Sequence, residues 1–191
     1  MGRIIATQYI SLDGVIEDPV GMEGSGLGNW VGPHERGPEG DAFKDEELND
    51  AAAVMLGRRT YDGFAAVWPT MKNPLADRMN ALPKYLASRT ITKPEWNNTT
   101  VLGDDLAASA RELKASVDGN IVIYGSASVC HVLAEAGLID EFALMVYPVV
   151  LGRGIKLFPE GVKIDLEPFD NRPLGGGIAL LCYRTRSHAG G

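Results

Sequence analysis

The stretch of this sequence best suited to bind a phosphate follows an apolar run at residues 51–56 and consists of Gly57, Arg58, Arg59 and Thr60. The apolar run is typical of a buried strand, and the residues after the glycine would form the first turn of a helix. That turn leaves N–H groups unpaired and carries a partial positive charge, which attracts anions. Arginine adds forked donors that match phosphate oxygens. Because paired arginines are also common on solvated helix faces, an ordinary helix start is the alternative.

Two more polar junctions follow predicted strands. The strand at residues 84–87 ends in a turn that contains Ser88, Arg89 and Thr90, and the strand at residues 120–124 ends in the helix-opening segment Gly125, Ser126, Ala127, Ser128 and Val129. Ligands of open α/β sheets bind at the carboxyl ends of the strands. Three such junctions, two of them with arginine, fit a ligand that bears several phosphates. A plain polar turn is the alternative at Ser88.

The three junctions suggest a division of roles within such a ligand. The backbone of residues 125–128 could approach a pyrophosphate closely, because no charged side chain stands in the way. Arg58 or Arg59, together with Ser88 and Arg89, would suit an outlying phosphate monoester, the feature that distinguishes NADP from NAD. The sequence has neither the glycine-rich dinucleotide fingerprint with its acidic partner nor the P-loop lysine motif, so we expect neither a classical Rossmann dehydrogenase nor a kinase.

Composition and charge argue against one class of function. The 191 residues carry a formal net charge of -7, which argues against nucleic-acid binding. We expect one domain at residues 1–186 and a flexible tail at residues 187–191. Cys130 and Cys182 are expected to be buried free thiols, and no cluster of residues resembles a metal site. No apolar stretch is long enough to span a membrane, so the sequence predicts a cytoplasmic protein.

Strand and helix patterns alternate along most of the chain. We predict strands at residues 4–10, 51–56, 84–87, 99–102, 120–124, 141–150, 155–158 and 178–186, and helices at residues 41–50, 58–66, 73–81 and about 104–117, with a last helix that ends near Ala136. Asp104 is the expected N-cap of the fourth helix, and Gly137 the C-cap of the last. This order predicts a mainly parallel sheet with an antiparallel C-terminal hairpin at its edge.

Two segments have more than one interpretation. The Gly-rich stretch at residues 18–40 is long enough to be a lid, a binding loop or an oligomer contact, and Trp30 within it could line a pocket or plug the edge of the core. The apolar run at residues 142–151 could lie at a subunit interface or form an inner strand of the core.

Several motifs resemble, in order, those of the dihydrofolate-reductase-like superfamily. They are residues 5–14, which end in Ser-Leu-Asp-Gly; residues 56–61; residues 88–90; residues 123–126; and residues 148–154, which read Pro-Val-Val-Leu-Gly-Arg-Gly. The most similar branch is the C-terminal reductase domain of the bifunctional riboflavin-biosynthesis deaminase-reductase and its stand-alone relatives. The resemblance covers about residues 3–184. Because no zinc deaminase precedes the domain, we do not expect the bifunctional enzyme itself.

The resemblance implies a three-layer α/β fold, with helices on both faces of a mixed sheet, and NADPH as the hydride donor. By position, residues 57–60 match the phosphate-binding helix start, residues 88–90 the segment at the adenosine 2′-phosphate, and residues 125–129 the turn under the pyrophosphate and nicotinamide. Ser11, Asp13 and Gly14 match the loop that closes over nicotinamide and substrate. Related reductase domains tend to pair, so a homodimer is expected.

The proton that accompanies a hydride usually comes from a carboxylate or an ordered water. Asp13 is the first candidate for a polar contact with the substrate. Asp41 is the second, because the carboxylate that binds the pterin in folate reductases would fall near it. Each has a structural alternative: Asp13 and Gly14 form a good turn pair, and Asp41 a good N-cap. Folate reductases have paired glycines where this chain has Gly125 and Ser126.

The sequence thus predicts an NADPH-dependent reductase of a small heterocyclic or carbonyl substrate, of the 5-amino-6-ribosylamino-uracil type. Two alternatives stay open. One is a protein that binds NADP(H) without turnover, as a sensor or assembly partner. The other is a true dihydrofolate reductase.

Overall fold

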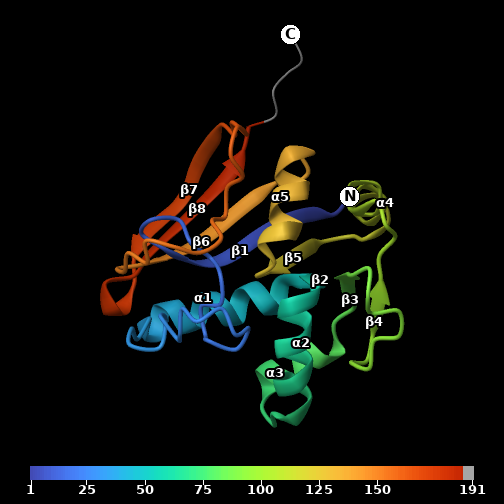
Figure 1. The fold of residues 1–191 in the computed structure, drawn as a ribbon, viewed down its shortest axis with the longest axis horizontal. Coiled ribbons are helices and arrows are strands. Elements are labelled where there is room, and N and C mark those ends of the chain that lie inside the picture. The colour runs from blue at the N-terminus through green and yellow to red at the C-terminus, as the bar shows by residue number, and fades with distance from the viewer. Residues whose placement is uncertain (187–191) are drawn as a thin grey trace.

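Eight strands form one sheet in the order β4-β3-β2-β5-β1-β6-β8-β7 in the computed structural model, which describes residues 1–186 (Figure 1). The neighbours from β4 to β6 all run parallel, whereas β8 is antiparallel to both β6 and β7. The predicted mainly parallel sheet with an antiparallel C-terminal hairpin is therefore confirmed. The strands are β1 Arg3–Ser11, β2 Ala51–Gly57, β3 Lys84–Ala87, β4 Thr99–Val101, β5 Asn120–Tyr124, β6 Glu141–Tyr147, β7 Leu166–Pro173 and β8 Ala179–Thr185.

Helices cover both faces of the sheet, as the three-layer prediction requires. The α-helices are α1 Gly37–Asp50, α2 Arg58–Val67, α3 Pro74–Ala81, α4 Leu106–Ser116 and α5 Ala127–Glu135, and the short 3₁₀ helices are η1 Trp68–Thr70 and η2 Gly175–Gly177. Figure 1 shows α1, α2 and α3 on one side and α4 and α5 on the other. The chain moves one way along the sheet from β1 to β4 and returns to β5 and β6, and right-handed crossovers then place the two sets of helices on opposite faces.

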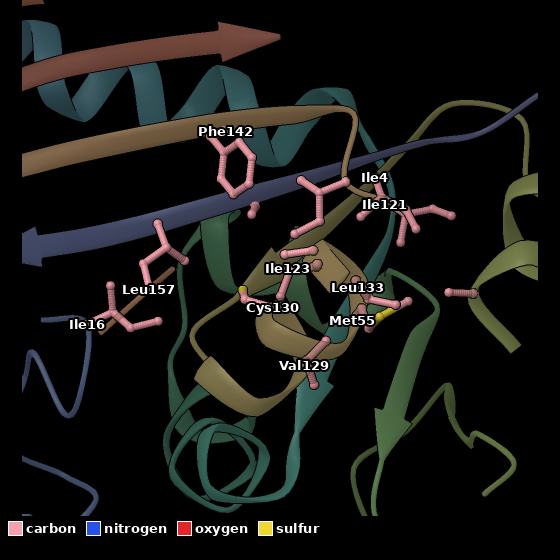
Figure 2. Packing of buried hydrophobic residues seen from close by; sticks show 14 of the residues in the cluster. Ile4, Ile16, Met55, Ile121, Ile123, Val129, Cys130, Leu133, Phe142 and Leu157 are labelled. Atoms are coloured by element: carbon pink, nitrogen blue, oxygen red, sulfur yellow. The ribbon is translucent and has the colours of Figure 1, made fainter. Parts of the chain in front are cut away.

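The central strands bury side chains on both faces, which is why they read as continuous apolar runs. In β2, Ala53 and Met55 pack in the cluster that includes α4 and α5, whereas Val54 and Leu56 pack in the cluster under α1, α2 and α3. Figure 2 shows the first cluster, in which Met55 and Leu133 meet between β2 and α5. The two faces of one sheet therefore have separate cores.

Two predicted helix boundaries were wrong. α1 begins at Gly37, four residues before the predicted start, and Pro38 lies in its first turn, where the missing N–H costs nothing. Asp41 is therefore inside α1 and is not its N-cap. The cap of α4 is Asp105 rather than Asp104, and its carboxylate accepts a hydrogen bond from the Ala108 N–H at 2.9 Å.

The C-terminal strands also differ from the prediction. β6 ends at Tyr147, before Pro148, and residues 155–158 contribute only an isolated bridge between Val15 and Lys156. β7 was missed because its sequence is polar and contains two prolines. An edge strand tolerates both features, since one row of its N–H groups needs no partner in the sheet.

The apolar run at residues 142–151 supplies an inner strand. β6 lies between β1 and β8, and Phe142 and Met145 are buried. This confirms the inner-strand interpretation for its first half, while Val150 is 65% exposed. The homodimer and the single domain stay predictions, and the predicted tail at residues 187–191 lies outside the described residues.

Both cysteines are free and buried, as expected. Burial raises the pKa of Cys130 and of Cys182 to about 12, so neither thiol ionises near neutral pH. Within residues 1–186, no helix has the length and apolar character that a membrane span requires.

Neighbouring residues of α5 provide a matched test of the core in Figure 2. Leu133 is completely buried and Val132 is 39% exposed. We expect Leu133→Ala to lower the free energy of unfolding by about 2–5 kcal/mol, because it removes apolar contacts and leaves a cavity. Val132→Ala should cost less than about 1 kcal/mol. Urea unfolding followed by circular dichroism checks both values, and equal losses would contradict this packing.

Candidate functional site

A cavity of about 720 Å³ opens at the carboxyl ends of four neighbouring parallel strands, β3, β2, β5 and β1. The strand order brings these ends together although they lie far apart in sequence. The cavity walls come from β1, the loop after it, α1, the starts of α2 and α5, η1, α3 and the turn after β3. All three phosphate-friendly junctions predicted from the sequence line this one space.

The starts of α2 and α5 touch each other, because β2 and β5 are neighbours in the sheet. A Cβ atom on Gly57 would lie 2.6 Å from Ser126 Oγ, and one on Gly125 would lie 2.6 Å from Thr60 Oγ1. Gly57 has an ordinary extended backbone with φ of -87°, so close approach rather than backbone freedom requires glycine there. Among the described residues, no side chain caps either helix, and both sets of first-turn N–H groups face the junction.

A chain of hydrogen bonds links the two helix starts to the long loop after β1. The Gly57 N–H donates to Ser126 Oγ, the Ser126 hydroxyl donates to Thr60 Oγ1 at 3.1 Å, and Thr60 donates to Glu23 Oε1 at 3.3 Å. Ser126 holds this position in the left-handed region with φ of 60°. Burial, and then repulsion by Asp18, raise the pKa of Glu23. A carboxylate of the protein therefore lies at the N-terminus of α2.

The arginines at this junction pair with carboxylates of the chain. Arg58 Nε lies 3.4 Å from Asp62 one turn later in α2, and Arg59 Nη1 lies 3.6 Å from Glu17 Oε1 in the loop. Both arginine side chains are more than half exposed, so these pairs are weak and can exchange for a ligand. At the end of β3, Arg89 is exposed and lines the cavity.

The turn after β3 is held by Ser88. Its Oγ accepts hydrogen bonds from the Thr90 N–H at 3.2 Å and from the Ile91 N–H at 3.0 Å. This is the polar turn that the sequence left open as an alternative. It also places Arg89 at the cavity, so the two interpretations are compatible at this position.

The other half of the cavity contains polar residues that the sequence analysis missed. Lys44 and Arg36 project from α1 and the residue before it, beside Thr7 and Tyr9 of β1 and Tyr124 of β5. Arg36 Nη1 donates to Tyr9 Oη at 2.7 Å, and its Nε pairs with Asp41 at 2.7 Å. The sequence did contain a sign of Lys44: it is the one basic residue at positions 39–50, which also contain six acidic residues.

The residues predicted to bind a cofactor lie together around the cavity. All of them line the cavity except Val129, which is buried in the core and would lie 3.4 Å from a Cβ atom on Gly57. The residues that line it are Gly57, Arg58, Arg59, Thr60, Ser88, Arg89, Thr90, Gly125, Ser126, Ala127 and Ser128.

The structure does not place Asp13 in the cavity. Its carboxylate accepts hydrogen bonds from the Ser11 hydroxyl at 2.7 Å, the Leu151 N–H at 3.1 Å and the Gly152 N–H at 2.8 Å. These bonds, the Ser11 one first, lower the pKa of Asp13 to about 2. Asp13 therefore joins the turn after β1 to the loop after β6, which is a structural role.

The remaining predicted residues also lie outside the lining. Ser11 and Gly14 belong to the turn that Asp13 holds, and the Asp41 carboxylate is taken up by Arg36. Trp30 is buried, donates through Nε1 to the Glu17 carbonyl at 3.0 Å, and packs edge-to-face on Tyr147. Trp30 thus plugs the edge of the core, the second of its two interpretations. Across residues 1–186, no group of three metal-ligating side chains converges.

Comparison with known proteins shows to which family the chain is similar. A model described as the RibD C-terminal domain matches residues 3–180. The uncharacterized protein YyaP of Bacillus subtilis (strain 168) is 28% identical over 189 residues, or 95% of this chain and 94% of YyaP. YwjB of the same organism, also uncharacterized, is 30% identical over 151 residues, or 79% of each chain.

Solved structures share the fold at low identity. A Shewanella sp. PV-4 protein provisionally described as a riboflavin biosynthesis protein has a TM-score of 0.76 at 19% identity, covering 96% of this chain and 99% of its own. A pyrimidine reductase-like protein of Corynebacterium diphtheriae has a TM-score of 0.66 at 15% identity, with 96% and 92% covered. The diaminohydroxyphosphoribosylaminopyrimidine deaminase/5-amino-6-(5-phosphoribosylamino)uracil reductase of Thermotoga maritima has a TM-score of 0.64 at 14% identity; 97% of this chain matches 57% of that protein.

The structural role of Asp13 gives a pH-dependent prediction. A carboxylate whose pKa is lowered by folding stabilises the protein above about pH 4, and that stabilisation is lost as the pH falls toward about 2. We expect Asp13→Asn to lower the free energy of unfolding at pH 6, and the difference from wild type to shrink at pH 3. Urea unfolding at both pH values tests this, with Asp104→Asn, at an exposed aspartate, as the control. A difference that does not change with pH would contradict the assignment.

Proposed function

The chain belongs to the RibD C-terminal domain family, a reductase domain of the dihydrofolate-reductase-like superfamily, and we propose that it uses NADPH to reduce a small heterocyclic or carbonyl substrate. One observation carries this proposal: three separate phosphate-friendly junctions converge on one cavity whose other half is aromatic and cationic. A ligand with phosphates at one end and a reactive ring at the other fits that arrangement.

The residues at the junctions suit the phosphates of NADPH. The starts of α2 and α5 meet at glycines that leave no room for a Cβ atom, and they offer backbone N–H groups with the positive ends of two helix dipoles. This pair would hold the pyrophosphate. Ser88 and Arg89 follow β3, which is the farthest from β1 of the four strands that end at the cavity. They would hold the 2′-phosphate, with Arg58 or Arg59 nearby. When bound, NADPH supplies a hydride from its nicotinamide ring.

The rest of the cavity would take the substrate. Phe64, Trp68 and Leu75 give the cavity an apolar wall, and Lys44 and Arg36 also line it. An apolar wall excludes water from the ring that is reduced, and cations orient its oxygens. The Thermotoga maritima protein is named as a uracil reductase, and a uracil-type ring would fit such a space. The alternative of a dihydrofolate reductase is disfavoured, because Asp41, the expected pterin carboxylate, is not in the lining.

Cofactor preference tests the phosphate assignment. We expect Arg89→Ala, and the double change Arg58→Ala with Arg59→Ala, to weaken NADPH binding about tenfold or more, because each removes charge-assisted donors to phosphate oxygens. NADH lacks the 2′-phosphate, so Arg89→Ala should leave its affinity within about twofold. Calorimetric titration measures the NADPH and NADH affinities of each variant. Arg111→Ala, on α4 at the opposite face of the sheet, is the control. Equal loss for both cofactors after Arg89→Ala would refute the 2′-phosphate site.

The carboxylate of Glu23 should couple NADPH binding to pH. Its pKa is already raised in the free protein, and phosphate nearby would raise it further, so binding takes up protons and affinity falls as the pH rises. We expect Glu23→Gln to bind NADPH more tightly at pH 8, by roughly tenfold if the repulsion is about 1.4 kcal/mol. Calorimetric titration with NADPH at several pH values from 5 to 8 gives the change of affinity with pH, which should be smaller in Glu23→Gln than in wild type. Glu39→Gln on α1 serves as the control, and parallel slopes in wild type and Glu23→Gln would contradict the coupling.

A further inference from the structure

Lys44 is the cation that reaches the strand ends in the substrate half of the cavity. Its Nζ donates to Thr7 Oγ1 at 3.1 Å and lies 5.0 Å from the centre of the Tyr124 ring and 5.6 Å from that of Tyr9. Thr7 and Tyr124 are paired in the parallel register of β1 and β5. The ammonium group therefore lies over the central strand pair, one residue before the Gly125 turn.

The ammonium group keeps one N–H bond for a ligand. A lysine has three such donors, and among the described residues two are committed, to Thr7 Oγ1 and to Glu47 Oε1. Glu47 also accepts a hydrogen bond from the Tyr124 hydroxyl at 3.1 Å. Burial, and then the Glu47 charge, raise the pKa of Tyr124 well above its usual value, so its hydroxyl stays a donor. These bonds fix the position of Lys44.

The two carboxylates that pair with Lys44 and Arg36 do not belong to the cavity lining. Lys44 and Arg36 belong to its lining, whereas their partners Glu47 and Asp41 do not. A ligand in this half of the cavity therefore meets ammonium and guanidinium groups before it meets any carboxylate. Such a surface favours an oxygen that carries negative charge over a cationic or amino-bearing edge.

The wall beside Lys44 is aromatic, and its neighbouring rings are tilted by 44° and 57° to one another. The rings of Tyr124 and Phe64 lie 6.0 Å apart, those of Phe64 and Trp68 lie 5.9 Å apart, and all three residues line the cavity. A planar molecule can stack on one of these rings and meet its neighbours edge-on. The site thus combines an aromatic surface with a fixed, partly free ammonium donor.

We propose that Lys44 binds an anionic or carbonyl oxygen of a planar heterocyclic substrate that packs against the aromatic wall of Tyr124, Phe64 and Trp68. The inference rests on the proposed function, because it assigns the substrate half of the same cavity. An ammonium group at this oxygen also stabilises the negative charge that reduction of the ring places on it. Lys44 is thus a specificity-determining residue for oxyanions and not only a support for α1.

Two probes with the same ring test the proposal. Orotate is a planar pyrimidine with a carboxylate, and uracil is the neutral ring without it. Calorimetric titration of the wild-type protein saturated with NADP⁺ should show orotate binding at least about tenfold tighter than uracil, as expected for one charge-assisted hydrogen bond. Lys44→Met should abolish this preference, because orotate loses a charge-assisted hydrogen bond and uracil at most a weaker one to a carbonyl oxygen, and Lys44→Arg should retain part of it.

Control variants and the binding of NADP⁺ distinguish a failure of the Lys44 proposal from a failure of the proposed function. Lys72→Met, at an exposed lysine outside the cavity, should behave like wild type, and Phe64→Ala should weaken both probes. Equal binding of orotate and uracil, no binding of either, or a preference that survives Lys44→Met overturns the inference. A wild-type protein that does not bind NADP⁺ overturns the proposed function instead. The probes are then titrated without cofactor, and the same criteria still decide the role of Lys44.

Discussion

The contact between the starts of α2 and α5 is the constraint on which the site depends. Because β2 and β5 are neighbours in a parallel sheet, the helices that follow them begin side by side. They can do so only with glycine at positions 57 and 125, since a Cβ atom at either position would lie 2.6 Å from Ser126 or Thr60. Two helix dipoles and two sets of N–H groups thus face one space, where an anion is the natural counterpart.

Electrostatic pairing within the chain explains how an acidic protein presents a basic cavity. The net charge is -7, yet five basic side chains line the cavity. Four of them have a carboxylate partner: Arg58 with Asp62, Arg59 with Glu17, Arg36 with Asp41, and Lys44 with Glu47. In the substrate half these partners lie outside the lining. At the junctions of α2 and α5, Glu17 and Glu23 belong to the lining, so an anion bound there would compete with them.

The two halves of the cavity differ in how well the sequence predicted them. The junctions around residues 57, 88 and 125 were predicted, lie within residues 3–180 that match the family model, and line the cavity. The other half, with α1 and the residue before it, was not predicted. Lys44 reaches this space because α1 passes the ends of β1 and β5, where Glu47 accepts a hydrogen bond from Tyr124 and Lys44 donates one to Thr7.

The sequence by itself determined the α/β class, the parallel sheet with its C-terminal hairpin, and the residues at the three junctions. Those features depend on local patterns, namely apolar runs and small residues at strand ends. Tertiary structure decided that β7 is an edge strand, that Asp13 joins two loops and that Asp41 pairs with Arg36. A carboxylate in a turn looks the same in sequence whether it faces a substrate or a backbone N–H, and only the long-range contacts of the folded chain distinguish the two.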